Sequence, residues 1–179
     1  MTESRRGRLQ VYTGEGKGKT TAALGATWRA LGAGLRVCFL QFLKGGLISS
    51  EQEFAPRCAG ALEFLNLGHP FSEALMAGHP SEEDRRYAEE TWALARAALA
   101  DPGYDLVVLD EINNTLQLGL LAPEEVLEAL RARPAGQEVI CTGRSAPAEL
   151  IALADLVTEM LAIKHPFDQG QGPRRGIEY

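Results

Sequence analysis

The chain has 179 residues, of which 45% are hydrophobic and 23% are charged, and its formal net charge is −6. This composition is typical of a globular domain, and the negative charge argues against broad, non-specific nucleic-acid binding, which normally needs a basic surface. The length fits a single domain, 1–179, with a sizeable core.

Apolar runs alternate with segments of helical periodicity along the chain. In order, we expect a strand at Leu9–Thr13, a helix at Lys19–Leu31, strands at Val37–Phe42 and Leu62–Leu67, a helix at Ser81–Ala100, a strand at Leu106–Asp110, a helix at Pro123–Arg131, a strand at Glu138–Thr142, a helix at Pro147–Ala154 and a strand at Leu156–Met160. Most strand runs are continuously apolar, as in parallel strands covered on both faces. The order predicts an open α/β sheet that binds ligands at the carboxyl ends of its strands.

Local signals support several of these elements. Ser81 and Asp84 resemble a capping box at the start of a helix. Trp28 and Trp92 occur at helical spacing with aliphatic residues, and we predict that both lie in the core. The tail Phe167–Tyr179 is rich in glycine and is expected to have little regular structure.

The chain shows no sign of membrane association or export. No apolar run approaches the roughly 18 residues of a membrane-spanning helix, and segment 1–8 lacks the apolar stretch of a secretory signal. Cys38, Cys58 and Cys141 are widely spaced without a CxxC pair, which favours free thiols over zinc ligands or disulfides. We therefore expect a cytoplasmic protein.

The first expected strand runs into a glycine-rich loop with the sequence Thr13-Gly14-Glu15-Gly16-Lys17-Gly18-Lys19-Thr20-Thr21. Glycines at alternating positions can turn several backbone N–H groups toward one anion. In such a loop Lys19 reaches the phosphates and the Thr20 hydroxyl ligates their Mg²⁺. The usual motif has glycine where this chain has Thr13. The segment is nevertheless predicted to be a phosphate-binding loop.

A second motif ends the apolar strand Leu106–Asp110 with two carboxylates, Asp110 and Glu111. Carboxylates at this place form the Mg²⁺ half of a nucleotide site, opposite the phosphate loop. Glu111 could activate a water molecule, as in motor ATPases, or could be a metal ligand. Spacing in the sequence does not separate these two roles.

Other charged residues follow strand ends and leave alternatives open. Arg144 could neutralise phosphate charge or pair with a carboxylate. Lys44 could contact a ligand or remain solvated, and His165 could be structural. Arg29, on the helix after the loop, could bind nucleotide or form a surface ion pair.

Taken together, these segments resemble the ATP:corrinoid adenosyltransferases of cobalamin biosynthesis, the BtuR/CobO type. The resemblance extends from Leu9 to Tyr179 and includes the loop with Thr13 in place of the first glycine. Its further blocks are Gln41-Phe42-Leu43-Lys44-Gly45, Val107-Val108-Leu109-Asp110-Glu111, Thr142-Gly143-Arg144, Lys164-His165-Pro166-Phe167-Asp168 and Gly176-Ile177-Glu178-Tyr179.

The resemblance implies a P-loop NTPase-like (RecA-like) three-layer sandwich with a mainly parallel sheet of about six strands. It also implies that the Co(I) of a reduced corrinoid attacks the 5′ carbon of ATP and expels triphosphate. The corrinoid would be cobalamin, cobinamide or cobyrinic acid diamide, and the electron donor a reduced flavin or flavodoxin. Family members are commonly homodimers, and no nucleic acid takes part.

The family pattern assigns roles to individual residues. Lys19 and Glu111 would be catalytic, and Thr20, Glu111 and Asp110 would hold Mg²⁺ or Mn²⁺. The substrate-binding set comprises Gly14, Glu15, Gly16, Lys17, Gly18, Lys19, Thr20, Thr21, Arg29 and Arg144, with Phe71 as an aromatic wedge against the corrinoid. The chain departs from the pattern in its short N-terminal segment and in having no Trp between Gly68 and Pro80.

Two other classes of enzyme contain similar motifs. A P-loop small-molecule kinase would share the loop and the carboxylates, but thymidine-kinase-like members bring a cysteine cluster that this chain lacks. A RecA-type ATPase would need basic DNA-contacting loops and an arginine acting in trans, for which Arg144 is the candidate.

Overall fold

The computed structural model describes residues 6–45, 48–68, 75, 77–166 and 170–179. In chain order its elements are β1 (Leu9–Thr13), α1 (Lys19–Gly32), β2 (Val37–Gly45), α2 (Ser50–Phe54), the 3₁₀ helix η1 (Ala55–Cys58), β3 (Leu62–Gly68), α4 (Glu82–Ala100), β4 (Leu106–Asp110), α5 (Ile112–Gln117), α6 (Pro123–Ala132), β5 (Glu138–Thr142), α7 (Ala148–Leu153) and β6 (Leu156–Glu159). Within these ranges, six strands form one sheet in the order β3-β2-β4-β5-β1-β6.

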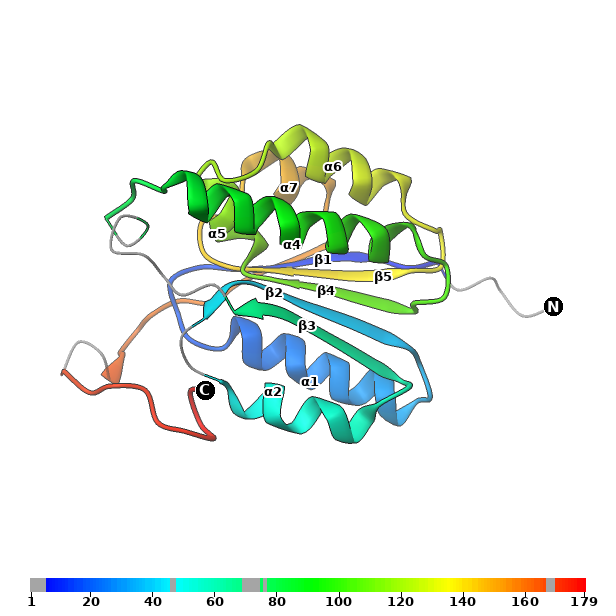
Figure 1. Cartoon of the computed structure of the whole chain (residues 1–179), viewed down its shortest axis with the longest axis horizontal. Helices are drawn as coiled ribbons and strands as arrows, with labels where there is room; N and C mark the ends of the chain where they lie inside the picture. The colour runs from blue at the N-terminus through cyan, green and yellow to red at the C-terminus, as the bar shows by residue number, and fades with distance from the viewer. Residues whose placement is uncertain (1–5, 46–47, 69–74, 76, 167–169) are drawn as a thin grey trace.

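All strand pairs in this sheet are parallel. Helices α4, α5, α6 and α7 cover one face, and α1 and α2 cover the other (Figure 1). The predicted three-layer α/β sandwich is therefore confirmed. Because the strands are parallel, their carboxyl ends lie at one edge of the sheet, where the motifs identified in the sequence are brought together.

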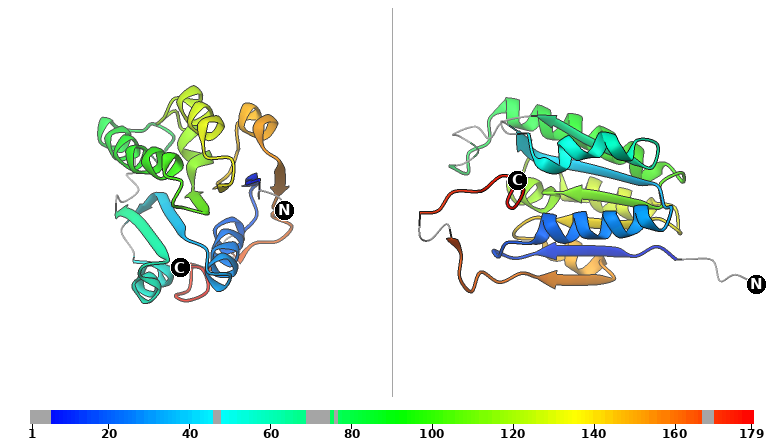
Figure 2. Two further views of the ribbon diagram at one scale, coloured as in Figure 1. Left: turned by 90° about the vertical axis from the view of Figure 1, so that its right-hand side faces the viewer. Right: turned by 90° about the horizontal axis from the view of Figure 1, so that it is seen from below.

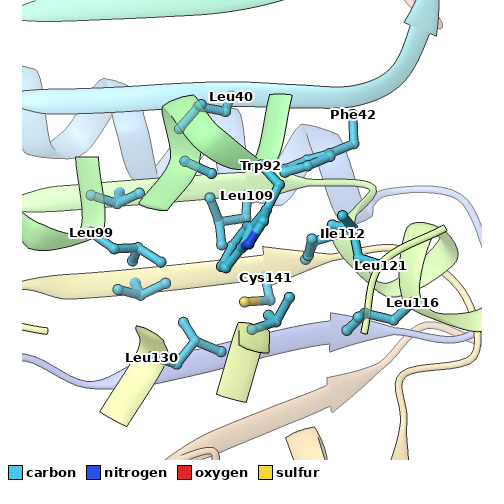
Figure 3. Close-up of a cluster of buried hydrophobic side chains, with 14 of the residues drawn as sticks. Leu40, Phe42, Trp92, Leu99, Leu109, Ile112, Leu116, Leu121, Leu130 and Cys141 are labelled. Atoms are coloured by element: carbon cyan, nitrogen blue, oxygen red, sulfur yellow. The ribbon is translucent and has the colours of Figure 1, made fainter. Parts of the chain in front are cut away.

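The core explains why the strand sequences are continuously apolar. All five residues of β4 are buried, because helices pack on both of its faces. Figure 3 shows the cluster on the α4 side, with the Trp92 ring lying among Phe42, Leu109 and Ile112. The predicted core position of Trp92 is confirmed, since only 5% of the residue is exposed.

The predicted core position of Trp28 is wrong. Helix α1 buries Lys19, Ala23, Thr27 and Ala30, and this stripe leaves Trp28 on the opposite side, 65% exposed. Its ring lies 5.6 Å from the ring of Phe54 in α2. Aliphatic neighbours at helical spacing did not reveal which face of the helix meets the sheet.

The helix caps and cysteines agree with the sequence analysis. The Ser81 hydroxyl accepts a hydrogen bond from the Asp84 N–H, and the Asp84 carboxylate accepts one from the Ser81 N–H, which together make the predicted capping box. Cys38 and Cys141 are buried free thiols, and burial raises the pKa of each to about 12. In the described part of the chain, every helix is too short or too polar to span a membrane.

Backbone strain is concentrated at the carboxyl edge of the sheet. Among the described residues, three that are not glycine have positive φ: Leu43 at 48°, Glu111 at 68° and Ser145 at 49°. Leu43 lies two residues before the end of β2, Glu111 directly follows β4, and Ser145 lies three residues beyond β5. Left-handed conformations of such residues cost of order 1–3 kcal/mol each and cluster at functional sites.

Candidate functional site

A cavity of about 800 Å³ opens at this edge of the sheet. Its walls come from the phosphate loop, the end of β2, the start of α2, the residue after β4, helix α5 and the C-terminal tail. The charged side chains that line it are Glu15, Lys17, Lys19, Lys44, Glu51, Glu111, Arg144 and Glu178. The volume lies in the upper part of the range usual for small-molecule sites.

The phosphate loop surrounds its own lysine. Only 8% of Lys19 is exposed, and its Nζ donates hydrogen bonds to the backbone oxygens of Gly14 at 2.6 Å and Gly16 at 2.8 Å. Burial lowers the pKa of Lys19, and the charge of Arg144 lowers it further, while Glu111 and other carboxylates oppose the shift. The ammonium group is thus held at the cavity wall, where an anion would lie.

The glycines of the loop also permit a close approach that the sequence did not reveal. A Cβ on Gly14 would lie 2.5 Å from the Met160 oxygen, and one on Gly16 would lie 2.6 Å from the Leu161 oxygen. The Gly16 N–H donates to the Met160 oxygen at 2.7 Å. Gly14 and Gly16 are therefore required for packing against the chain beyond β6, as well as for the shape of the loop.

Thr13, which replaces the usual first glycine, has a structural role of its own. It is buried, and its hydroxyl accepts a hydrogen bond from the Ala146 N–H at 3.1 Å. This bond ties the start of the phosphate loop to the connection between β5 and α7.

Asp110 is the centre of a buried polar network. It is fully buried and accepts hydrogen bonds from the hydroxyls of Thr20 at 2.9 Å and Thr142 at 2.6 Å, and from the Gln41 amide at 3.3 Å. The Lys44 ammonium lies 3.7 Å from the same carboxylate. The network joins the phosphate loop to β2, β4 and β5.

Glu111 faces the cavity directly beside this network. Its left-handed backbone turns the chain from β4 into α5, and its N–H donates to the Thr142 hydroxyl at 3.0 Å. Desolvation, followed by the charge of Asp110, raises the pKa of the Glu111 carboxyl to about 7, against the opposing charges of Lys44 and Lys19. A cation bound nearby would favour its ionised form.

The donor set fits Mg²⁺. Thr20 and Glu111 offer a hydroxyl and a carboxylate oxygen at the cavity, which Mg²⁺ prefers, and the Asp110 carboxylate accepts a hydrogen bond from the Thr20 hydroxyl behind them. No group of three His, Cys, Asp or Glu side chains in the described ranges could hold a metal ion. Mg²⁺ at this site would therefore take its remaining ligands from substrate phosphates and water.

The structure brings most of the other predicted residues to the cavity. Gly18, with φ of 126°, and Thr21 line it, and Arg144 pairs with Glu15 at 3.2 Å. Both alternatives for Arg144 are thus compatible with its place: it lines the cavity and it has a carboxylate partner. Lys44 and His165 also line the cavity.

Arg29 is not brought to the site. Helix α1 points away from the phosphate loop, and Arg29 is exposed in its last turn, about 15 Å along the helix from Lys19. Arg29 does not line the cavity, and its contact with the substrate stays a prediction. Phe71, the predicted aromatic wedge, lies outside the described residues.

Several cavity residues had no predicted role. Ser50 and Glu51 come from α2, which the sequence analysis did not predict, and Asn114 comes from the equally unpredicted α5. Gly176 to Tyr179 belong to the tail for which little structure was expected. The only sign in the sequence that the tail belongs to the site was the resemblance of its last four residues to a block of the family.

Glu111→Gln is expected to stabilise the metal-free protein at neutral pH. Because the pKa of Glu111 is raised in the folded state, this state holds a proton that the unfolded chain loses, and stability falls as pH rises from about 4.5 to 7. Glu111→Gln does not lose stability in this way. The difference between its free energy of unfolding and that of the wild type should therefore grow by about 2 kcal/mol between pH 5 and pH 8. Urea unfolding with a chelator present measures the difference.

Glu15→Gln is the matched control, since Glu15 is an exposed carboxylate on the phosphate loop. Its stability difference from the wild type should stay nearly constant over the same pH range. A Glu111→Gln variant with an equally constant difference would contradict the electrostatic description of Glu111.

Comparisons with known proteins identify the family of the chain. The family model described as ATP:corrinoid adenosyltransferase BtuR/CobO/CobP matches residues 5–179. The corrinoid adenosyltransferase of Pseudomonas aeruginosa is 40% identical over 174 residues, which cover 97% of this chain and 84% of that protein. That of Escherichia coli is 37% identical over 179 residues, which cover 100% of this chain and 89% of that protein.

A solved structure supports the fold alone. The flagellar accessory protein FlaH from Methanocaldococcus jannaschii superposes with a TM-score of 0.54 at 14% identity, covering 87% of this chain and 71% of that one. The family resemblance noted in the sequence is thus confirmed by the family model and by close relatives over nearly the whole chain. The chain belongs to the ATP:corrinoid adenosyltransferase family of the BtuR/CobO/CobP type and is a transferase.

Proposed function

We propose that the single domain 1–179 transfers the 5′-deoxyadenosyl group of ATP to the Co(I) of a reduced corrinoid and releases triphosphate, in the biosynthesis or salvage of adenosylcobalamin. The observation that carries this proposal is the placement of Lys19, Thr20 and Glu111 around one cavity, with the buried Asp110 bonded to the Thr20 hydroxyl behind it. The bond between cobalt and the 5′ carbon forms as the bond between that carbon and the triphosphate oxygen breaks.

The protein's contribution in this reaction is binding and electrostatics. The cobalt supplies the electron pair, so the chain needs neither a side-chain nucleophile nor a general base. Lys19 and the backbone N–H groups of the loop would hold the triphosphate and stabilise the charge that develops on its leaving oxygen. Holding the 5′ carbon in line with the cobalt would accelerate the reaction further.

Thr20 and Glu111 would hold Mg²⁺, and the buried Asp110 would orient the Thr20 hydroxyl from behind. When bound, Mg²⁺ would add positive charge at the phosphate oxygens. Mn²⁺ has the same preference for oxygen ligands and would serve in its place. Lys44 would then balance the negative charge of Asp110, the carboxylate that does not hold the metal ion.

The biological setting is part of the same proposal. We infer a cytoplasmic enzyme that receives electrons from reduced flavin or a flavodoxin-type protein and acts on cobalamin, cobinamide or cobyrinic acid diamide. We also infer a homodimer. Exposed apolar side chains along the edge strand β6, Leu156 and Val157, are compatible with a contact between subunits.

Spectroscopy tests the reaction. The protein is incubated with Mg-ATP and chemically reduced cobalamin under anaerobic conditions, and the light-sensitive absorption of an adenosylated corrinoid is followed. We expect its appearance to require both ATP and divalent metal. Formation of ADP and phosphate with no adenosylated corrinoid, even when Co(I) is supplied, would instead favour a kinase or an ATPase.

A further inference from the structure

The C-terminal residues 174–179, hereafter the tail turn, form one wall of the cavity. They lie beside α1 and α2 at the carboxyl edge of the sheet, where both views of Figure 2 show the chain end. Gly176, Ile177, Glu178 and Tyr179 line the cavity together with the phosphate loop. A segment far from the loop in sequence is thus part of the same site.

The tail turn is a small folded unit. The Arg174 N–H and guanidinium donate three hydrogen bonds to the Glu178 carboxylate, at 2.8, 3.1 and 3.0 Å. The N–H groups of Ile177 and Glu178 donate to the Arg174 backbone oxygen. Bonds from Arg174 lower the pKa of Glu178 to about 2, so its carboxylate is ionised at neutral pH.

Two ion pairs attach this unit to different walls of the cavity. Glu178 pairs with Lys17 of the phosphate loop at 3.2 Å, and Arg175 pairs with Glu53 of α2 at 2.6 Å. The Ser50 hydroxyl also donates to the Tyr179 backbone oxygen at 3.0 Å. The tail turn therefore bridges the phosphate loop and α2.

The ion pair of Lys17 with Glu178 is the contact of the tail turn that a bound nucleotide would affect. It lies between Gly16 and Gly18 in the loop proposed to hold the triphosphate. A triphosphate there would attract the Lys17 ammonium and repel the Glu178 carboxylate. The pair is partly exposed, with 44% of the Lys17 side chain and 21% of the Glu178 side chain accessible, and such pairs are weak.

We propose that Glu178 is a positioning residue that competes with the triphosphate for Lys17. Binding of nucleotide would then release the tail turn from the phosphate loop, while Arg175 and Ser50 keep it attached to α2. This inference rests on the proposed function and deepens it, because it makes one wall of the cavity responsive to the first substrate.

Calorimetric titration of Mg-ATP, without corrinoid, tests the competition. Glu178→Gln should bind Mg-ATP about three- to tenfold more tightly than the wild type, because the competing carboxylate is gone. The gain should shrink at high salt, since it arises between partly exposed charges. It should also be clearly smaller when Glu178→Gln is combined with Lys17→Met, because only the direct repulsion between Glu178 and the triphosphate then remains to be removed.

Glu53→Gln is the matched control, since it removes the other ion pair of the tail turn without touching Lys17. Its affinity for Mg-ATP should remain within about twofold of the wild type. Unchanged or weaker binding by Glu178→Gln, or a gain of the same size with Lys17→Met, would overturn the inference alone. A wild-type protein that binds no Mg-ATP would overturn the proposed function and this inference with it.

Discussion

Lys19→Ala is expected to slow corrinoid adenosylation by about 10²- to 10³-fold while the protein stays folded. Lys19 is the buried cation of the phosphate loop, and its Nζ bonds only to loop backbone among the contacts described for it. Its removal takes away a preorganised charge from the position where the leaving triphosphate would lie, and losses of this size are typical for such groups. The loop contributes little to the core, so the effect on folding should be small.

Initial rates with saturating Mg-ATP and reduced cobalamin, together with urea unfolding, measure both effects. Lys17→Ala is the control, because Lys17 belongs to the same loop but has a partly exposed side chain paired with Glu178. Its loss of rate should be less than about tenfold. A fully active Lys19→Ala variant would show that the phosphate loop is assigned incorrectly.

Asp110→Ala is expected to lower the free energy of unfolding by about 2–4 kcal/mol. The substitution leaves Thr20, Thr142, Gln41 and Lys44 without their shared acceptor in a buried place. The variant should also lose metal-dependent binding of ATP, because the Thr20 hydroxyl is no longer oriented. Glu111→Gln offers a contrast, since it should lose activity while gaining stability.

Urea unfolding and calorimetric titration of ATP, each with and without Mg²⁺, check this prediction. Glu15→Ala serves as the control, because Glu15 is a cavity carboxylate with an exposed side chain and a single ion pair, to Arg144, among its described contacts. Its unfolding free energy should change by less than about 1 kcal/mol. An Asp110→Ala variant as stable as the wild type would contradict the central role of this carboxylate.

The sheet was predictable because its strands carry their own signal. Runs such as Leu106–Leu109 are apolar at every position, and parallel strands covered on both faces require this. Their carboxyl ends necessarily share one edge, so the phosphate loop and Asp110–Glu111 were expected to meet. The hydrogen bond from the Thr20 hydroxyl to the Asp110 carboxylate joins the two motifs directly.

The remaining parts of the site depend on contacts that no local pattern encodes. The pair of Arg175 with Glu53 joins residues 122 positions apart, and the pair of Lys17 with Glu178 joins residues 161 apart. Helix α2 has five residues, too few for a hydrophobic period to be recognised. The orientation of α1, which leaves Trp28 exposed, is likewise decided by packing against the sheet.

In the proposed reaction, the phosphate loop holds a triphosphate that leaves intact. Phosphorus-31 NMR of a reaction containing Mg-ATP and an excess of reduced cobalamin tests it most directly. The mechanism predicts one equivalent of inorganic triphosphate for each adenosylated corrinoid, with ADP and AMP absent. Corrinoid adenosylation accompanied by pyrophosphate and phosphate from the first turnover, or nucleotide consumed to ADP, would contradict it.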